Sequence, residues 1–207
     1  TDRIGYFVDQ KNPYITYESE YIESLWSILG KIHDKGLVYK DYRVVPWCPR
    51  CGTALSSHEL AQGYADVKDL SVYVKFKVKG KADTYLLAWT TTPWTLPGNM
   101  FLAVKPEHDY VAVEFPDEVV ILARERYKNG YEKFGGEVLF PYIKGTELEG
   151  IEYEPLFSYF AERAGAFRVV TADFVTLDEG TGIVHIAPAF GDDDRRSLTP
   201  RRPPAAG

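Results

Sequence analysis

Beyond residue 65 the chain is a succession of short apolar runs separated by glycine and proline. In the run over residues 72–79, valine and phenylalanine at every second position alternate with tyrosine and lysine. This period of two is typical of a strand with one buried face. Further strand candidates lie at residues 85–89, 101–104, 110–115, 119–123, 167–171 and 182–186. Many short strands with such punctuation favour a β-barrel or a sandwich.

One amphipathic helix is predicted before this region. Over residues 18–35 the apolar side chains recur at helical spacing, and Gly36 follows as a C-cap. Ser56 and Glu59 have the spacing of a capping box, which predicts a brief helix, and residues 158–165 leave room for one more. The expected fold class is therefore α+β, mainly β: a β-barrel-like domain with short peripheral helices, preceded by one amphipathic helix.

The composition is that of an ordinary globular protein, because 45% of the 207 residues are hydrophobic and 26% are charged. The formal net charge of −6 argues against a broad basic surface for non-specific binding of nucleic acid. The lysines within residues 75–81 are expected to be a solvated strand face, so any RNA contact should be local. No signal peptide or membrane-length apolar run is visible, and we expect a cytoplasmic protein with no membrane partner.

The two cysteines, Cys48 and Cys51, form a CxxC motif. They lie too close in sequence for a structural disulfide framework, and in an intracellular chain such a pair indicates metal binding or redox chemistry. A thiolate pair at this spacing is the usual first half of a tetrahedral zinc site, with His58 as an alternative third ligand. A redox role needs a thioredoxin-like βαβ context, which the sequence does not show. We therefore expect half of a zinc-ribbon over residues 43–64.

The segment WTTTPWTLPGN, residues 89–99, ends a strand in three threonines and then turns. Two prolines and a glycine stop the strand, which leaves hydroxyl and backbone N–H groups at a rim. Such a rim suits a ribose and an ester. Consecutive threonines are also ordinary strand residues, so the run alone does not identify a site.

A second segment, DEGTGIVHIAPAFGDDD at residues 178–194, carries one histidine and three aspartates. His185 ends an apolar run and precedes a loop with proline, a position from which an imidazole can face a pocket, although a lone histidine is more often structural. The aspartate run is by default a solvated loop or a helix N-terminus favoured by the dipole. A carboxylate beside a small pocket is also a natural receptor for a substrate ammonium group.

Both segments resemble the signature peptides of the editing insertion in class I synthetases for isoleucine, valine and leucine. The pieces RIGYFVDQKNPYITYESEYIESLW and VVPWCPRCGTALSSHELAQGY are similar to isoleucyl-tRNA synthetases immediately before that insertion. The valyl and leucyl enzymes typically have arginine where this chain has Thr92, so the sequence TPWT at residues 92–95 is similar to the isoleucyl form. The resemblance implies an editing (CP1) domain of an isoleucyl-tRNA synthetase.

The resemblance also implies roles for the residues of the threonine segment. Thr90, Thr91 and Thr92 would contact the terminal adenosine and the ester of the substrate. Trp94 and Thr95 would help to wall the pocket for the amino-acid side chain.

In the second segment, the resemblance implies a role for one histidine and one aspartate. His185 would limit the size of the pocket against isoleucine, with a general base as the alternative role because its reference pKa lies near 6.5. Asp194 would hold the α-ammonium group. An amphipathic helix should continue after Asp194 in this family, whereas here an Arg/Pro-rich stretch follows.

The implied activity is hydrolysis of the ester of mischarged Val-tRNA(Ile), extended to valyl-adenylate, by a size-excluding pocket and a positioned water. One missing methylene gives only about 1–3 kcal/mol of discrimination, a limit for which isoleucine against valine is the established example. Editing itself would need no cofactor, and zinc would require ligands from the missing part of the parent enzyme. The implied partners are the 3′ end of tRNA(Ile) carrying valine and the rest of the synthetase.

Two rival functions stay open from sequence: a non-catalytic tRNA- or zinc-binding module, and a hydrolase with a threonine nucleophile, for which no base partner is evident. No HIGH-type or KMSKS-type segment is present, so the chain is not expected to activate isoleucine. The expected divisions are residues 1–42 as a piece of the parent catalytic domain and connector, 43–64 as the half zinc-ribbon, 65–194 as the editing β-barrel and 195–207 as a disordered tail.

Overall fold

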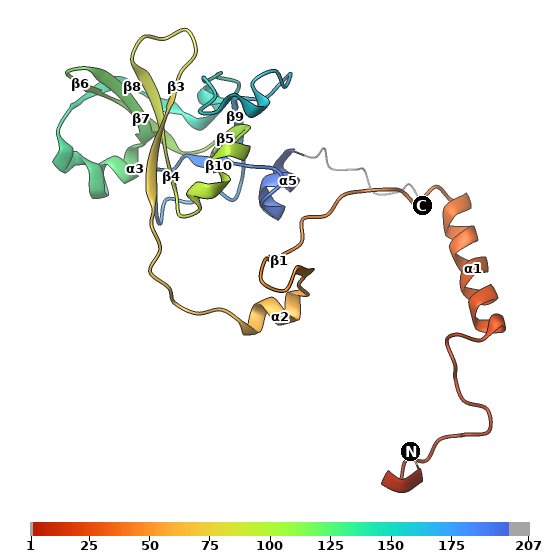
Figure 1. The fold of residues 1–207 in the computed structure, drawn as a ribbon. Helices are drawn as coiled ribbons and strands as arrows, with labels where there is room; N and C mark the ends of the chain where they lie inside the picture. The colour runs from red at the N-terminus through yellow and green to blue at the C-terminus, as the bar shows by residue number, and fades with distance from the viewer. Residues whose placement is uncertain (1, 199–207) are drawn as a thin grey trace. The chain divides into compact units, whose positions relative to one another are not determined.

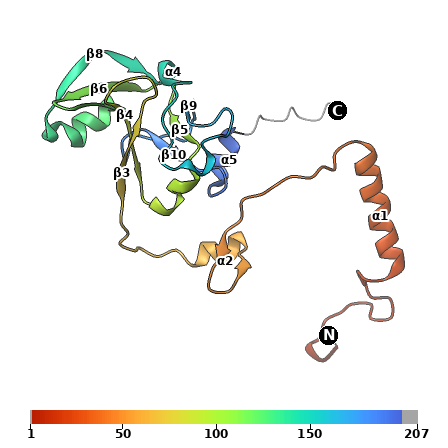
Figure 2. The same ribbon diagram turned by 45° about the horizontal axis from the view of Figure 1, so that its top comes forward.

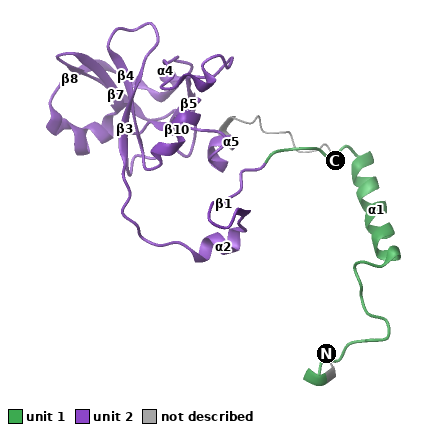
Figure 3. Cartoon of the chain, viewed as in Figure 1, with its two compact units in different colours: residues 1–42, 202–207 green, residues 43–201 purple. Residues whose placement is uncertain are grey.

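The structure, a computed structural model, describes residues 2–198 (Figure 1). Contacts within the chain divide it into two units. Of the described residues, those up to Tyr42 belong to the first unit and those from Arg43 onward to the second (Figure 3). The α+β class is confirmed, with helix and strand in about equal amounts over residues 2–198. The finer domain divisions stay predictions.

The first unit contains a short 3-10 turn, η1 (Asp2–Ile4), and the predicted amphipathic helix, α1 (Ser19–Asp34). Gly36 has a φ of +69° and its N–H donates to the carbonyl of His33 at 2.7 Å. This left-handed residue ends the helix as a glycine C-cap does. None of the α1 residues is buried, so its apolar stripe is exposed.

The second unit begins with a small hairpin that contains the two cysteines. Strand β1 (Trp47–Cys48) pairs antiparallel with β2 (Thr53–Ala54). Helix α2 (Ser57–Gln62) follows, and its capping box is complete, because the Ser56 side chain accepts from the Glu59 N–H and the Glu59 carboxylate accepts from the Ser56 N–H. The brief helix predicted from this spacing is confirmed.

The larger sheet contains β3 (Val72–Lys77), β4 (Thr84–Thr90), β7 (Glu118–Ala123), β6 (Asp109–Phe115) and β8 (Glu137–Lys144), in that order. Figure 2 labels β3, β4, β6 and β8 of this sheet. Only the β4–β7 pair is parallel. In the second half of β4, every other residue is buried: Leu86, Ala88 and Thr90. Thr90 therefore lies on the face of the strand that forms the core.

The smaller sheet has β5 (Phe101–Val104) at its centre, β9 (Arg168–Thr171) parallel to it and β10 (Val184–Ile186) antiparallel. Residues 151–154 connect the two sheets through the bridges Val78↔Tyr153 and Glu152↔Arg168. The outer strands β8 and β10 do not pair within residues 2–198. The predicted barrel is therefore open, because its two edge strands are not hydrogen-bonded to each other.

The main core lies where the inner faces of these two sheets meet. Its largest fully buried members are Phe76, Leu86, Leu102, Tyr110, Leu148, Tyr153 and Ile183. A second cluster covers the opposite face of the larger sheet and includes Val111, Val113, Leu122 and Tyr127. Burial of apolar surface at about 25 cal/mol per Å² is the main force that holds the sheets together.

Short helical pieces connect the strands: η2 (Pro93–Gly98), α3 (Arg124–Arg126), the π-helix η3 (Tyr127–Tyr131), η4 (Glu132–Phe134), α4 (Gly145–Leu148), η5 (Ser158–Phe160) and α5 (Asp192–Leu198). The helix expected over residues 158–165 is thus a single 3-10 turn. Residues 195–198, predicted to start a disordered tail, continue α5, since three aspartates in its first turn favour a helix N-terminus. The rest of that predicted tail lies outside the described residues.

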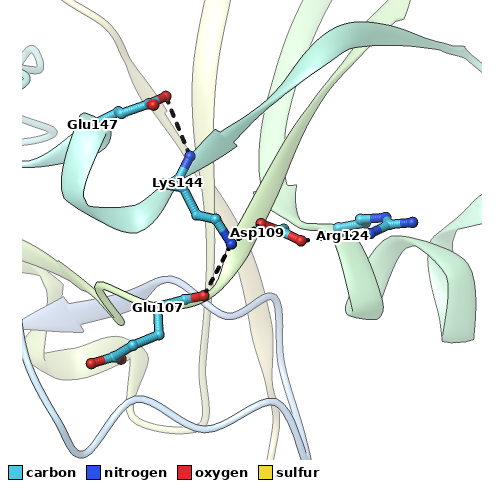
Figure 4. A network of polar contacts seen from close by, with 5 residues as sticks. All are labelled: Glu107, Asp109, Arg124, Lys144 and Glu147. Carbon is cyan, nitrogen blue, oxygen red and sulfur yellow. Dashed lines mark hydrogen bonds and ion pairs between the residues drawn. The ribbon is translucent and has the colours of Figure 1, made fainter.

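A polar network joins β6, β8 and α3 at one end of the larger sheet (Figure 4). The Asp109 carboxylate pairs with the Lys144 ammonium at 2.5 Å and with the Arg124 guanidinium at 3.5 Å. The hydrogen bond from Lys144 lowers the pKa of Asp109 below its ordinary value. Arg124 also lies over the ring of Tyr142, 4.2 Å from its centroid. These contacts attach α3 to the sheet away from the cavity.

Across residues 2–198 there is no helix whose length and apolar character would let it span a bilayer.

Candidate functional site

A cavity of about 450 Å³ opens at the ends of β4 and β10 in the second unit. Its lining includes all but one of the residues predicted for the site: Thr90, Thr91, Thr92, Thr95, His185 and Asp194. Trp94 is 63% exposed and is not part of the lining. Segments about ninety positions apart in the sequence therefore form one cavity.

The three threonines lie where β4 ends and η2 begins. Pro93 occupies the first position of η2, where its missing N–H costs no hydrogen bond. The Thr92 N–H donates to Thr90 Oγ1 at 3.1 Å, and the two hydroxyl oxygens are 3.2 Å apart. Thr90 is buried, whereas Thr91 and Thr92 are exposed at the rim. The arrangement presents hydroxyl groups at the mouth of the cavity.

The imidazole of His185 is held from both sides. Its Nε2 lies 2.8 Å from Thr95 Oγ1 and its Nδ1 lies 3.1 Å from Asn99 Nδ2. The side chain is only 8% exposed, and burial lowers the pKa of His185 to about 4. The imidazole is therefore neutral above about pH 5. Two buried hydrogen bonds fix the ring as a rigid part of the cavity wall.

Asn99 and Tyr153 support this histidine from behind. The Tyr153 hydroxyl donates to Asn99 Oδ1 at 2.8 Å, and Asn99 Nδ2 also donates to the Phe101 carbonyl at 3.0 Å. Both side chains are buried. Asn99 ends the WTTTPWTLPGN segment, but its role was not predicted. No sequence signal links Tyr153, on the segment that joins the sheets, to His185.

Asp194 lies in the first turn of α5 and lines the cavity. Its Oδ2 accepts a hydrogen bond from the Ala187 N–H at 2.9 Å. Burial, followed by repulsion from Asp193, raises the pKa of Asp194 above its ordinary value, although the bond from Ala187 opposes this. A carboxylate that has lost part of its hydration at a cavity wall gains from a charge-assisted hydrogen bond, so Asp194 is suited to receive a cationic group of a ligand.

Residues 179–182, at the start of the second segment, line one wall of the cavity, and Arg126 holds this stretch in place. Its guanidinium donates to the carbonyls of Gly180 at 2.9 Å, Leu177 at 3.1 Å and Asp178 at 2.9 Å. Gly182 has a φ of +75°, and a Cβ there would lie 2.4 Å from Ala123 Cβ. Sequence reasoning missed Arg126, because nothing in its own segment indicates contact with a loop more than fifty residues later.

The CxxC motif does not form a comparable site. Cys48 is partly buried and Cys51 is exposed. The Cys51 N–H donates to Cys48 Sγ at 3.4 Å, and this bond lowers the pKa of Cys48. The ring of His58 is hydrogen-bonded to Gln62 at 2.8 Å. Within residues 2–198 no group of three or more histidine, cysteine or acidic side chains could hold a metal ion, so two thiols alone do not provide tetrahedral zinc coordination.

A solved structure, the crystal structure of GlLeuRS-CP1, has the same fold over part of the chain. It matches with a TM-score of 0.52 and 23% sequence identity, and it covers 61% of this chain and 58% of its own. The likeness supports the mixed-sheet architecture.

Sequence relatives are much closer. The isoleucine–tRNA ligase of Clostridium tetani is 51% identical over 194 residues, which are 94% of this chain and 18% of the ligase. That of Clostridium kluyveri is 55% identical over 195 residues, again 94% of this chain and 18% of the ligase. This chain therefore spans less than a fifth of these curated relatives. The family model for tRNA synthetases class I (I, L, M and V) matches residues 1–188. The chain belongs to the class I tRNA synthetases of this group.

Proposed function

We propose that the cavity is the editing site of an isoleucyl-tRNA synthetase and hydrolyses the ester of mischarged Val-tRNA(Ile). The observation that carries this proposal is the convergence of the threonine rim, His185 and Asp194 on one cavity. The high identity to isoleucine–tRNA ligases supports the choice of isoleucine among the amino acids of this family.

The cavity matches the chemistry of an aminoacylated 3′ end. Its volume of about 450 Å³ lies within the usual range for small-molecule sites. The hydroxyl groups of Thr91 and Thr92 at the rim suit the ribose and the ester, and the Asp194 carboxylate suits the α-ammonium group of the amino acid. The net charge of −6 is consistent with a short, local contact to the end of the tRNA.

Size exclusion explains the preference for valine over isoleucine. Thr95 and His185 are buried and hydrogen-bonded to each other, so the wall that they form resists displacement. A binding difference of one methylene is worth about 1–3 kcal/mol, and the isoleucine–valine pair is the established example of this limit. A rigid wall rejects isoleucine by steric overlap, which is a stronger discrimination than loss of one contact.

Hydrolysis requires a water positioned against an ester that is already reactive. Asp194 orients the substrate through its ammonium group, and the threonine hydroxyls stabilise the charge that develops on the carbonyl oxygen. His185 serves as a wall rather than a general base, because both of its ring nitrogens are engaged by Thr95 and Asn99. Water adds to the carbonyl carbon, and the bond from that carbon to the ribose oxygen breaks. The ribose oxygen takes the proton released by the attacking water and leaves as the 3′-terminal hydroxyl, while valine leaves as the free amino acid.

The same proposal includes the wider expectations from the sequence. Valyl-adenylate is a second substrate of the site, editing uses no cofactor, and zinc binds Cys48 and Cys51 only with ligands from elsewhere in the parent synthetase. The body of tRNA(Ile) is held by other parts of that enzyme. The cytoplasmic location stays a prediction.

Comparison of Val-tRNA(Ile) with Ile-tRNA(Ile) as substrates of the 207-residue chain tests the proposal. We expect release of valine but not isoleucine, and a loss of about 100-fold or more in Asp194→Ala, since the charge-assisted bond to the ammonium is removed. Asp193→Ala is the matched control. The Asp193 carboxylate is exposed and lies outside the cavity lining, so this variant should hydrolyse Val-tRNA(Ile) at the wild-type rate.

Three outcomes would contradict the assignment: full activity of Asp194→Ala, equal hydrolysis of the two esters, or tRNA binding without any hydrolysis. The last outcome would favour the non-catalytic tRNA-binding module instead. A trapped acyl-threonine intermediate would favour a threonine nucleophile.

A further inference from the structure

We propose that Tyr153, acting through Asn99, is a positioning residue that holds His185 in a single neutral tautomer with its proton on Nε2. The proposal deepens the function given above, because it concerns the wall that selects the substrate, but its main measurement needs no substrate.

The direction of each hydrogen bond follows from counting protons. Asn99 Nδ2 carries two protons, one donated to the Phe101 carbonyl and the other directed to His185 Nδ1. Nδ1 therefore accepts, and a neutral imidazole that accepts at Nδ1 carries its proton on Nε2.

The far side of the ring agrees with this assignment. Thr95 Oγ1 has one proton, and it donates that proton to the Thr92 carbonyl at 2.8 Å. Toward His185 Nε2, 2.8 Å away, the threonine oxygen can only accept. Both neighbours of the imidazole thus require the same tautomer.

Tyr153 contributes by fixing which way the Asn99 amide faces. Its hydroxyl donates to Asn99 Oδ1 at 2.8 Å, so the amide oxygen turns toward Tyr153 and the NH₂ group toward His185. The Phe101 carbonyl holds the amide in the same orientation, because it accepts a hydrogen bond from that NH₂ group. Tyr153 is itself immobilised, since it is 1% exposed and packs edge-on against Phe76 and Phe167.

This arrangement opposes protonation of His185 beyond the effect of burial. A proton on Nδ1 would face the NH₂ group of Asn99, and only rotation of that amide would offer it an acceptor. The titratable groups that share the cavity are Asp194 and Glu179, while burial is the cause that lowers the pKa of His185. Removing the Tyr153 hydroxyl makes amide rotation easier and should therefore raise this pKa.

NMR of the whole chain labelled with ¹⁵N-histidine tests the proposal directly. The chain has four histidines, and the resonances missing in His185→Gln identify those of His185. At pH 7 we expect Nδ1 in the unprotonated range and Nε2 in the protonated range. A proton on Nδ1 in the wild type would overturn the proposal.

Two substitutions then shift the titration by different amounts. Asn99→Asp replaces the donor by a carboxylate, which should move the proton to Nδ1 and raise the pKa of His185 by about 1–3. Tyr153→Phe removes one of the two hydrogen bonds that orient the Asn99 amide. It should raise the pKa of His185 by about 1, a tenfold change in the protonation constant. Tyr127→Phe is the control, because Tyr127 is also buried but its hydroxyl meets only the Gly135 and Gly136 carbonyls at 3.5 Å.

If Tyr153→Phe titrates as Tyr127→Phe does, Tyr153 has no positioning role and the proposal fails. Deacylation gives a separate measurement: the preference for Val-tRNA(Ile) over Ile-tRNA(Ile) should fall about fivefold to tenfold in Tyr153→Phe, because the Thr95–His185 wall loosens. A raised pKa of His185 in Tyr153→Phe, in a chain that hydrolyses neither ester, would support the positioning role and refute the editing function. Editing activity with an unchanged pKa of His185 in Tyr153→Phe would do the reverse.

Discussion

The cavity and the CxxC hairpin both begin from a short signature peptide, yet only the cavity is complete within residues 2–198. The fold brings three distant residues to the threonine segment. Tyr153 and His185 form hydrogen bonds with it, and Asp194 lines the same cavity. Cys48 and Cys51 contact each other, and the described part of the chain adds no further ligands to them. A signature peptide therefore becomes a site only where the fold also supplies the partners.

The two regions differ in burial as well. His185 and Thr95 are each 8% exposed, whereas Cys51 is exposed on a two-stranded hairpin. Buried polar groups are costly to disturb, because each one that is left without a hydrogen-bond partner lowers the stability of the fold by about 1–3 kcal/mol. Substitutions at the cavity should therefore have large effects, and substitutions at the hairpin should have small ones.

Gly182→Ala should have the largest effect. A Cβ at this position would lie 2.4 Å from Ala123 Cβ and 3.0 Å from Leu177 Cδ2, and φ is +75°. The overlap and the strained backbone should lower the free energy of unfolding by about 3 kcal/mol. Displacement of the wall should reduce hydrolysis of Val-tRNA(Ile) about 100-fold, as measured by single-turnover deacylation.

Gly150→Ala separates the two causes of this effect. Gly150 has a similar φ of +80°, but a Cβ at this position would meet no atom within 4 Å. The substitution should cost about 1–2 kcal/mol through backbone strain alone and leave deacylation unchanged. Equal effects of the two alanine variants would show that the wall at Gly182 is not tightly packed.

The buried His185 should make stability depend on pH. Its pKa is about 4 in the folded chain and about 6.5 when unfolded. As the pH falls below 6.5 the unfolded chain takes up the proton and the folded chain does not, so folding loses stability until about pH 4. The stability advantage of wild type over His185→Gln should shrink by about 2 kcal/mol between pH 7 and pH 5. Urea unfolding at both pH values measures it, and a constant difference would contradict burial as the cause.

Arg126→Ala tests the support of the cavity wall. Loss of the guanidinium frees the carbonyls of Leu177, Asp178 and Gly180. We expect KM for Val-tRNA(Ile) to rise about tenfold with a smaller change in kcat, because the wall becomes mobile rather than absent. Arg124→Ala is the matched control from the same helix, since Arg124 pairs with Asp109 away from the cavity (Figure 4). Equal KM changes in the two variants would mean that Arg126 acts only through general stability.

The smallest effect is expected when Cys48 and Cys51 are both replaced by serine. Cys51 is exposed and Cys48 is only partly buried, and surface substitutions change stability by about 0.5 kcal/mol or less. The hairpin also contributes no residue to the cavity lining. Deacylation should stay within about twofold of wild type. Metal analysis of the wild-type chain should find zinc well below stoichiometric; a full zinc site abolished by this double substitution would break the contrast between the two regions.

Local sequence patterns predicted most elements but not their closure. The helical spacing before Gly36 and the period of two in β3 identified these elements within a residue or two. Strand β8 was missed, because it is an edge strand whose partly buried and exposed residues do not alternate. The expected barrel is not closed, because β8 and β10 do not pair among the described residues. Whether these two strands meet depends on the curvature of the sheets and not on the sequence of either strand.

The candidate site was predicted where one peptide carries the chemistry and missed where support comes from elsewhere. Thr92, His185 and Asp194 stand in recognisable segments, and all three line the cavity. Tyr153 acts through one long-range hydrogen bond to Asn99, and Arg126 acts through three hydrogen bonds to the carbonyls of a distant loop. Such contacts leave no local pattern, because they depend on how two distant segments pack.

The Thr95–His185 hydrogen bond has a consequence for synthesis, since it joins residues 90 positions apart. At about 5–20 residues per second, the ribosome adds His185 roughly 5–20 s after Thr95. During that interval β4 and η2 are present without the strand that faces them, and loop closure over such a distance is slow relative to local pairing. A nascent chain arrested before His185 would contain the whole threonine segment and still lack the cavity.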